Sequence, residues 1–210
     1  MADCCAVDAQ NRQERRLLWV VLVLNAIMFI VEFAAGWLAN SSGLLADSLD
    51  MLADAMVYSL SLYAVGKAVS KKARAALLNG GLQLTLGLWV LADVAWRMWS
   101  GSTPSAELMG SVALLALAVN VTCFLLLFRF RRGDVNMRAS WICSRNDILA
   151  NTGVLVAAGF VAWLDSPWPD RVIGALIAAI VIHSAWRIIG EARQSLRTGE
   201  VVANSCCDKD

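Results

Sequence analysis

Six long apolar segments constrain the fold of this 210-residue chain more than any other feature of its sequence. A helix that crosses a bilayer needs about 20 largely apolar residues, because the hydrocarbon core is about 30 Å thick. The tails and loops outside these segments are too short to form a soluble domain with its own core. The segments that meet the length condition are residues 17–39, 44–66, 75–99, 107–128, 139–163 and 169–190.

The sequence therefore predicts an all-α integral membrane protein with six transmembrane helices. We expect a tail at residues 1–16, a six-helix domain at 17–190 and a second tail at 191–210. Composition agrees, since 59% of the residues are hydrophobic and only 17% are charged, against roughly 25% in soluble domains. The first segment is longer than the apolar part of a signal peptide and contains Glu32, so we expect it to be retained.

Basic residues are segregated between the loops. Most of them lie in the tails and in the second and fourth loops, and few lie in the other three. Because cytoplasmic loops of membrane proteins carry an excess of Lys and Arg, both termini are expected in the cytoplasm. This topology signal also explains the basic loops without nucleic-acid binding. The expected location is a membrane, the inner membrane if the source is bacterial. The basic residues on the cytoplasmic side are Arg12, Arg15, Arg16, Lys67, Lys71, Lys72, Arg74, Arg129, Arg131, Arg132, Arg138, Arg187, Arg193, Arg197 and Lys209.

Two pairs of polar side chains interrupt the apolar segments at the same spacing. Asp50 and Asp54 lie four residues apart in the second segment, and Cys143 and Asp147 lie four apart in the fifth. Residues at this spacing share one face of a helix. Ionisable groups inside a membrane are costly and usually functional. Together the two pairs suggest a four-coordinate divalent metal site, with metal transport as the first hypothesis and polar contacts between helices as the alternative.

The residues around these pairs form a longer pattern. Asn25, Glu32 and Gly36 read N-x6-E-x3-G, and residues 41–54 read S-x2-L-x-A-D-x2-D-x3-D. Cys143, Asp147 and residue 151 read C-x3-D-x3-N. In order and spacing the chain resembles the cation diffusion facilitator family of divalent metal/proton antiporters. The resemblance implies six helices with a metal held between the second and the fifth.

The resemblance also assigns ligand positions. It places Asp50 and Asp54 on the second helix and Asp147 on the fifth, with Cys143 where family members have His or Asp. A thiolate is a softer ligand, which favours zinc, cadmium, mercury or cuprous copper. A thiol must also lose its proton to bind metal. We expect the metal pathway or the hydrogen bonds around the ligands to involve Asp47, Asn25, Glu32, Asn146 and Asn151.

The function implied is export of divalent cations from the cytoplasm in exchange for protons. Zinc is the first expected substrate, with cadmium or mercury as alternatives, and no resident cofactor is expected. Two other functions stay open: a mercury or copper transporter that uses the cysteines, and a metal-binding partner subunit that does not transport. No His-Glu-x-x-His helix or phosphate loop indicates an enzyme.

The tails carry two further cysteine pairs, Cys4-Cys5 and Cys206-Cys207. They suggest capture of soft metal ions near the pore entrance, or are incidental. Many members of the family continue into a cytoplasmic ferredoxin-like domain, whereas this sequence ends 20 residues after the sixth segment. We therefore expect a short form that forms a homodimer through its membrane helices. Cys123 is expected in the core, and Asp93 and Arg97 are spaced for a structural ion pair.

Overall fold

The computed structural model describes the backbone of residues 12–63, 69–128 and 135–199. Within these ranges, the side chains of residues 12–14, 61, 63, 72, 135–144 and 146 lie outside the description. The described part is all-α and contains no strand, as the sequence predicts. Its six helices are α1 (Arg12–Leu38), α2 (Ser42–Tyr63), α3 (Val69–Ser100), α4 (Ala106–Phe128), α5 (Val135–Leu164) and α6 (Trp168–Thr198).

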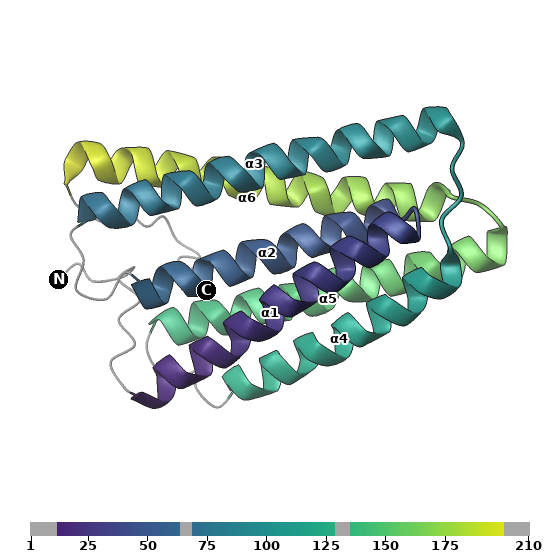
Figure 1. The fold of residues 1–210 in the computed structure, drawn as a ribbon. Helices are drawn as coiled ribbons and strands as arrows, with labels where there is room; N and C mark the ends of the chain where they lie inside the picture. Colours follow the sequence, from purple (N-terminus) through teal and green to yellow (C-terminus); the bar gives the residue numbers. More distant parts are fainter. Residues whose placement is uncertain (1–11, 64–68, 129–134, 200–210) are drawn as a thin grey trace.

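The helices lie side by side in one bundle and alternate in direction along the chain (Figure 1). α3 and α6 run along each other, α1 packs on α2, and α4 packs on α5. α2 contacts four other helices, namely α1, α3, α5 and α6. It is therefore the central helix of the bundle, and its side chains face protein on most sides.

Five of the helices are long and apolar enough to cross a membrane by length and composition. α2 is not among the five, and it carries three aspartates in its 22 residues. A helix of that length still spans about 33 Å. Its neighbours enclose it, so its polar groups can lie at membrane depth without contacting lipid. The other five spans are Arg15–Leu38, Val69–Ser100, Ala106–Phe128, Asp147–Leu164 and Trp168–Thr198.

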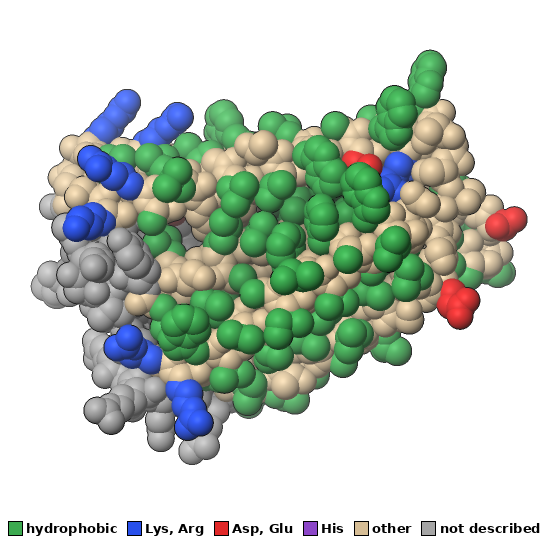
Figure 2. All heavy atoms as spheres, in the orientation of Figure 1, with side chains coloured by type: hydrophobic (Ala, Val, Ile, Leu, Met, Phe, Trp, Pro, Cys, Tyr) green, Lys and Arg blue, Asp and Glu red, His purple; other side chains and the backbone are tan. Residues whose placement is uncertain are grey.

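Charged side chains gather at the two ends of the bundle, with a broad apolar belt between them (Figure 2). The described start of α1 carries Arg15 and Arg16, and the start of α3 carries Lys71 and Arg74. The end of α6 adds further arginines, so this end is basic. That is the distribution expected if the basic end faces the cytoplasm. We call the opposite end, formed by residues 39–42, 97–106 and 164–171, the outer end.

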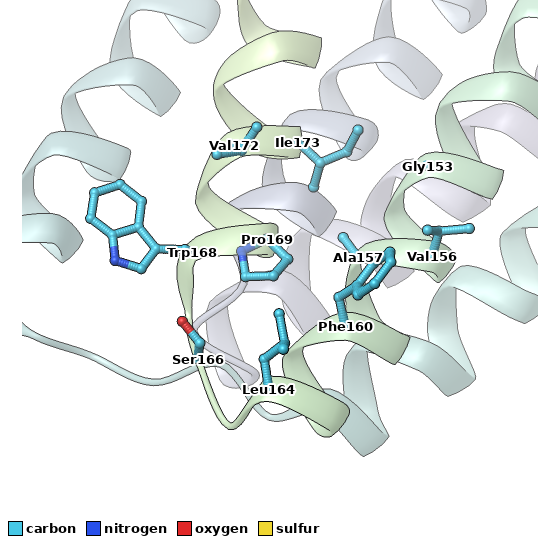
Figure 3. A pocket seen from close by; sticks show the side chains of 10 residues that line it. All are labelled: Gly153, Val156, Ala157, Phe160, Leu164, Ser166, Trp168, Pro169, Val172 and Ile173. Atoms are coloured by element: carbon cyan, nitrogen blue, oxygen red, sulfur yellow. The ribbon is translucent and has the colours of Figure 1, made fainter.

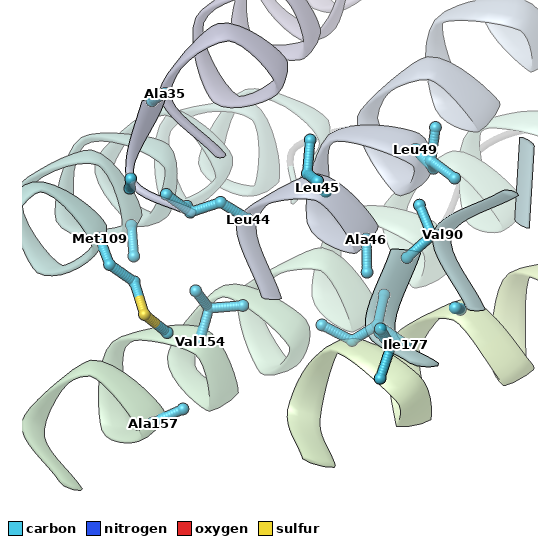
Figure 4. Close-up of a cluster of buried hydrophobic side chains, with 14 of the residues drawn as sticks. Ala35, Leu44, Leu45, Ala46, Leu49, Val90, Met109, Val154, Ala157 and Ile177 are labelled. Atoms are coloured by element: carbon cyan, nitrogen blue, oxygen red, sulfur yellow. The ribbon is translucent and has the colours of Figure 1, made fainter. Parts of the chain in front are cut away.

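The main core lies nearer the outer end and draws side chains from all six helices (Figure 4). Leu44, Leu45 and Leu49 of α2 belong to it, each at most 2% exposed. α1 approaches α2 closely at Gly36, where an added Cβ would lie 2.9 Å from the backbone nitrogen of Leu45. Cys123 is buried in a second apolar cluster, which confirms its expected place in the core.

Candidate metal centre

Five carboxyl groups lie close to one another between α1, α2 and α5: Glu32, Asp47, Asp50, Asp54 and Asp147. The Asp147 carboxyl interacts electrostatically with Asp47, Asp50 and Asp54. Glu32 interacts with Asp47 and Asp50 in the same way. Three of the four ligands expected from sequence, and the two acidic residues expected nearby, therefore lie in the same part of the bundle.

Asp54 and Asp147 are in direct contact. Their carboxyl groups face each other across the α2–α5 interface, near enough for a hydrogen bond when one of them carries a proton. Asp54 is 7% exposed and Asp147 is 4% exposed. A carboxylate can only accept hydrogen bonds, so a hydrogen bond within the pair requires a proton on one of them. This contact places one acidic residue from each of the two predicted ligand pairs at a common point.

Tyr58 is a member of this site that the sequence analysis did not identify. Its hydroxyl donates a hydrogen bond to Oδ2 of Asp54, with an oxygen–oxygen distance of 3.0 Å. Its side chain is almost fully buried beside Leu18 and Val21 of α1. The spacing could have revealed it, because Asp50, Asp54 and Tyr58 follow one another at intervals of four and share a helix face.

Glu32 and Asp47 are buried acidic residues whose carboxyl groups lack described hydrogen-bond partners. Both are 0% exposed. None of their four side-chain oxygens has a hydrogen-bond partner among the described residues. Asn25 and Asn151 each donate to a carbonyl of their own helix, to Val21 at 2.9 Å and to Asp147 at 3.0 Å. Their buried Oδ1 atoms have no described partner either.

No described Lys, Arg or His forms an ion pair with any of the five acidic residues. The ion pairs in the described residues join Arg97 to Asp93, as the sequence predicts, and Arg187 to Glu191. Buried carboxylates without a counter-charge or donors are strongly destabilising. The cluster therefore needs protons or a bound cation to be neutralised.

The described residues do not form a ready-made metal site. Among them, no three His, Cys, Asp or Glu side chains are grouped closely enough to hold an ion. Cys143 and Asn146 lie on α5, but their side chains are outside the described residues. The four tail cysteines Cys4, Cys5, Cys206 and Cys207 also lie outside them. The complete ligand set thus stays a prediction.

Two hollows in the surface lie away from the acidic cluster. One, of about 440 Å³, is an apolar groove between the outer ends of α5 and α6 (Figure 3). Its lining includes Phe160, Trp168 and Ile173 and no carboxyl group. The other, of about 280 Å³, lies at the outer end beside Asp93 and Arg97. Neither hollow is the metal centre, because neither contains any of the five clustered acidic residues.

Comparison with known proteins gives the family. Residues 18–197 match the cation efflux transmembrane domain. The chain is 25% identical over 209 residues to the zinc transporter ZitB of Yersinia pseudotuberculosis, covering 92% of this chain and 66% of that protein. It is 24% identical over 196 residues to the metal cation efflux system protein CzcD of Cupriavidus metallidurans, covering 88% and 62%.

A third relative is the cadmium, cobalt and zinc/H(+)-K(+) antiporter of Bacillus velezensis, which is 22% identical over 200 residues, covering 88% of this chain and 64% of that protein. The chain thus spans slightly less than two thirds of the length of these relatives. The family match covers most of the six-helix bundle and confirms the resemblance drawn from the motifs. The chain belongs to the cation efflux family and is a multi-pass membrane protein.

Proposed function

We propose that this chain exports divalent transition-metal cations from the cytoplasm in exchange for protons. The observation that carries the proposal is the cluster of five carboxyl groups, four of them buried and that of Asp50 partly buried, without a described counter-charge inside a membrane bundle. Zinc is the first candidate substrate. Zinc, cadmium and cobalt in the names of the similar proteins support a substrate of this class.

In the proposed mechanism, metal binding is coupled to proton release. We expect Asp54 and Asp147 to share a proton when no metal is bound, because two charged carboxylates this near each other repel. Both carboxyl groups must be deprotonated to coordinate a cation. A metal that binds between α2 and α5 therefore displaces this proton, and a proton that returns from the other side displaces the metal.

The proposed cycle is alternating access around this point. Metal enters from the basic, cytoplasmic end and binds Asp50, Asp54 and Asp147, with Cys143 as the fourth ligand. The helices then move so that the site opens to the outer end. Protons from outside protonate the carboxyl groups and release the metal. Repulsion between the neighbouring carboxyl groups favours their re-protonation once the metal leaves.

The test is transport in liposomes that contain the purified protein. Uptake of zinc, cadmium, mercury and manganese is measured with and without a pH gradient, for the wild type and for Asp54→Asn. Glu107→Gln, which neutralises an exposed acidic residue at the start of α4, is the matched control. We expect gradient-driven uptake in the wild type and control, and none in Asp54→Asn.

Two results would contradict the proposal. Normal transport by Asp54→Asn would remove the buried site from the mechanism. Metal binding by the wild type without transport of any of the four ions would instead identify a metal-binding partner subunit. Comparison of the wild type with Cys143→His then tests the soft-metal alternative, because a mercury or copper transporter should lose its preference for soft ions when the thiol is replaced.

A further inference from the structure

The N-terminus of α2 is capped by a residue from another helix. Asp170, in the first turn of α6, accepts hydrogen bonds from the backbone nitrogens of Ser42 at 2.8 Å and Gly43 at 2.9 Å. The hydroxyl of Ser41 donates to the same carboxyl group at 2.6 Å. The first N–H groups of a helix have no partner within it, and a negative charge there is favourable. Asp170 in α6 thus supplies hydrogen-bond acceptors for the first N–H groups of α2.

The backbones of the two helices meet at the same place. A Cβ added to Gly174, one turn after Asp170, would lie 2.7 Å from both the carbonyl carbon and the oxygen of Ser42. A Cβ on Gly43 would lie 2.9 Å from Oδ1 of Asp170. Because backbone atoms cannot adjust as flexible side chains do, this contact fixes the distance between α2 and α6.

The residue that follows Asp170 in α6 contacts another helix, α3. Arg171 donates from Nη2 to the carbonyl oxygens of Arg97 and Ser102, each at 2.9 Å. These carbonyls lie at the end of α3 and in the loop that follows it. The first turn of α6 therefore fixes the ends of both α2 and α3, and α6 acts as their common support.

We propose that Asp170 is a positioning residue for metal transport: by capping α2 from α6, it sets the depth and rotation of α2 and so places Asp50 and Asp54. This inference rests on the proposed function. Asp50 lies eight residues after Ser42, about 12 Å along the same helix. A rotation or shift of α2 at its capped end moves both side chains together, and coordination does not tolerate displacements of about 1 Å.

The experiment compares Asp170→Asn with the wild type. Asparagine keeps the shape but puts an NH₂ group where one oxygen accepted a hydrogen bond. Zinc uptake into liposomes gives KM and Vmax, and equilibrium zinc binding to the purified protein gives Kd. We expect KM and Kd to rise by about tenfold, the effect typical of residues that orient metal ligands. A residue that only stabilises the fold would reduce the folded fraction and Vmax, and leave KM and Kd unchanged.

The control is Asp165→Asn. Asp165 is exposed in the α5–α6 turn, and its φ of 46° suits asparagine as well as aspartate. We expect this variant to behave as the wild type. If Asp170→Asn does not fold, Ser41→Ala decides the question: it leaves the carboxylate in place but removes one of the three hydrogen bonds to it, along with the bond that the Ser41 hydroxyl accepts from the N–H of Leu44 at 3.1 Å. It should raise KM and Kd by about threefold.

The outcomes separate this inference from the proposed function. Unchanged KM and Kd in the variants, with a transporting wild type, would overturn the role of Asp170 and leave the transport proposal standing. A wild type that binds zinc and does not transport it would contradict the transport proposal. The Kd measurements would still decide whether Asp170 positions the ligands.

Discussion

Two kinds of buried acidic residue occur in this bundle, and they differ in the donors around them. Asp170 is 1% exposed and accepts three hydrogen bonds, two of them from backbone N–H groups. Glu32 and Asp47 are equally buried, and none of their oxygens has a described partner. Burial alone therefore does not mark a functional acidic residue. A buried carboxyl group without donors indicates an ion or proton site, because an unsatisfied carboxylate persists only where a cation or proton neutralises it.

The position of each carboxyl group along the helices explains the difference. Asp170 faces the first turn of α2, where backbone N–H groups have no partner in their own helix. Asp47 and Glu32 lie further along α2 and α1, where the helix already uses its own N–H groups. An acidic residue that faces the start of a helix therefore finds free backbone N–H donors, whereas an acidic residue that faces a helix interior finds few.

The largest effect is expected at the acidic residues proposed to bind the metal. Asp54→Asn and Asp147→Asn should each reduce transport by about a hundredfold or more, since each removes a proposed ligand. The double variant should be little worse than either single one, because the two carboxyl groups act as a pair. Transport rates of the three variants in liposomes check this. Independent, multiplicative losses would show that the two residues do not share one site.

The difference in donors predicts that the same substitution, aspartate to asparagine, has opposite effects on stability at Asp47 and at Asp170. Asp47→Asn loses no described hydrogen bond and removes the cost of protonating a buried carboxyl group at neutral pH, so it should raise the free energy of unfolding by about 1–3 kcal/mol. Asp170→Asn leaves a donor facing the N–H of Ser42, and should lower it by about 1–3 kcal/mol. Unfolding of both variants in detergent, by heat or denaturant, measures the two effects. If both variants were destabilised, donors would not be what distinguishes these acidic residues.

The sequence predicted the bundle and part of the site because those features are local. Length and hydropathy indicated six helices, and spacing placed Asp50 and Asp54 on one face. Hydropathy could not locate helix ends in the polar regions: α3 begins at Val69, where the apolar segment begins at residue 75. Nor could any periodicity show that Asp170 meets Ser42, because the contact joins residues 128 positions apart.

A third prediction concerns the backbone contact that accompanies the cap. Gly174→Ala places a methyl group 2.7 Å from the backbone of Ser42 and should destabilise the protein by about 1–3 kcal/mol. Gly159→Ala is the matched control, because nothing lies within 4 Å of its added Cβ. Alanine is the better helix former, so the control should be neutral or more stable by up to about 1 kcal/mol. Equal unfolding temperatures for both variants would contradict a tight α2–α6 contact.

The smallest effect is expected at Tyr58. Its hydroxyl makes Asp54 an intermediate case, with fewer hydrogen-bond donors than Asp170 and more than Glu32 or Asp47. Tyr58 gives one acidic residue of the cluster, Asp54, a single donor at 3.0 Å. Tyr58→Phe keeps the buried ring and removes that hydrogen bond, which is worth about 1 kcal/mol, so Kd for zinc should rise about fivefold. Thr152→Val is the control, since it removes an exposed hydroxyl that bonds only to its own helix, at Ile148.

Equilibrium zinc binding to the two purified variants separates positioning from packing. A rise in Kd for Tyr58→Phe, with unchanged stability and an unaffected Thr152→Val, means that the hydroxyl orients Asp54 toward the metal. An unchanged Kd would mean that Asp54 holds its position through Asp147 alone. A single donor would then not be enough to fix the orientation of a carboxyl group in this cluster. The three donors around Asp170 would instead reflect its role as a helix cap, which an acidic residue of the cluster does not share.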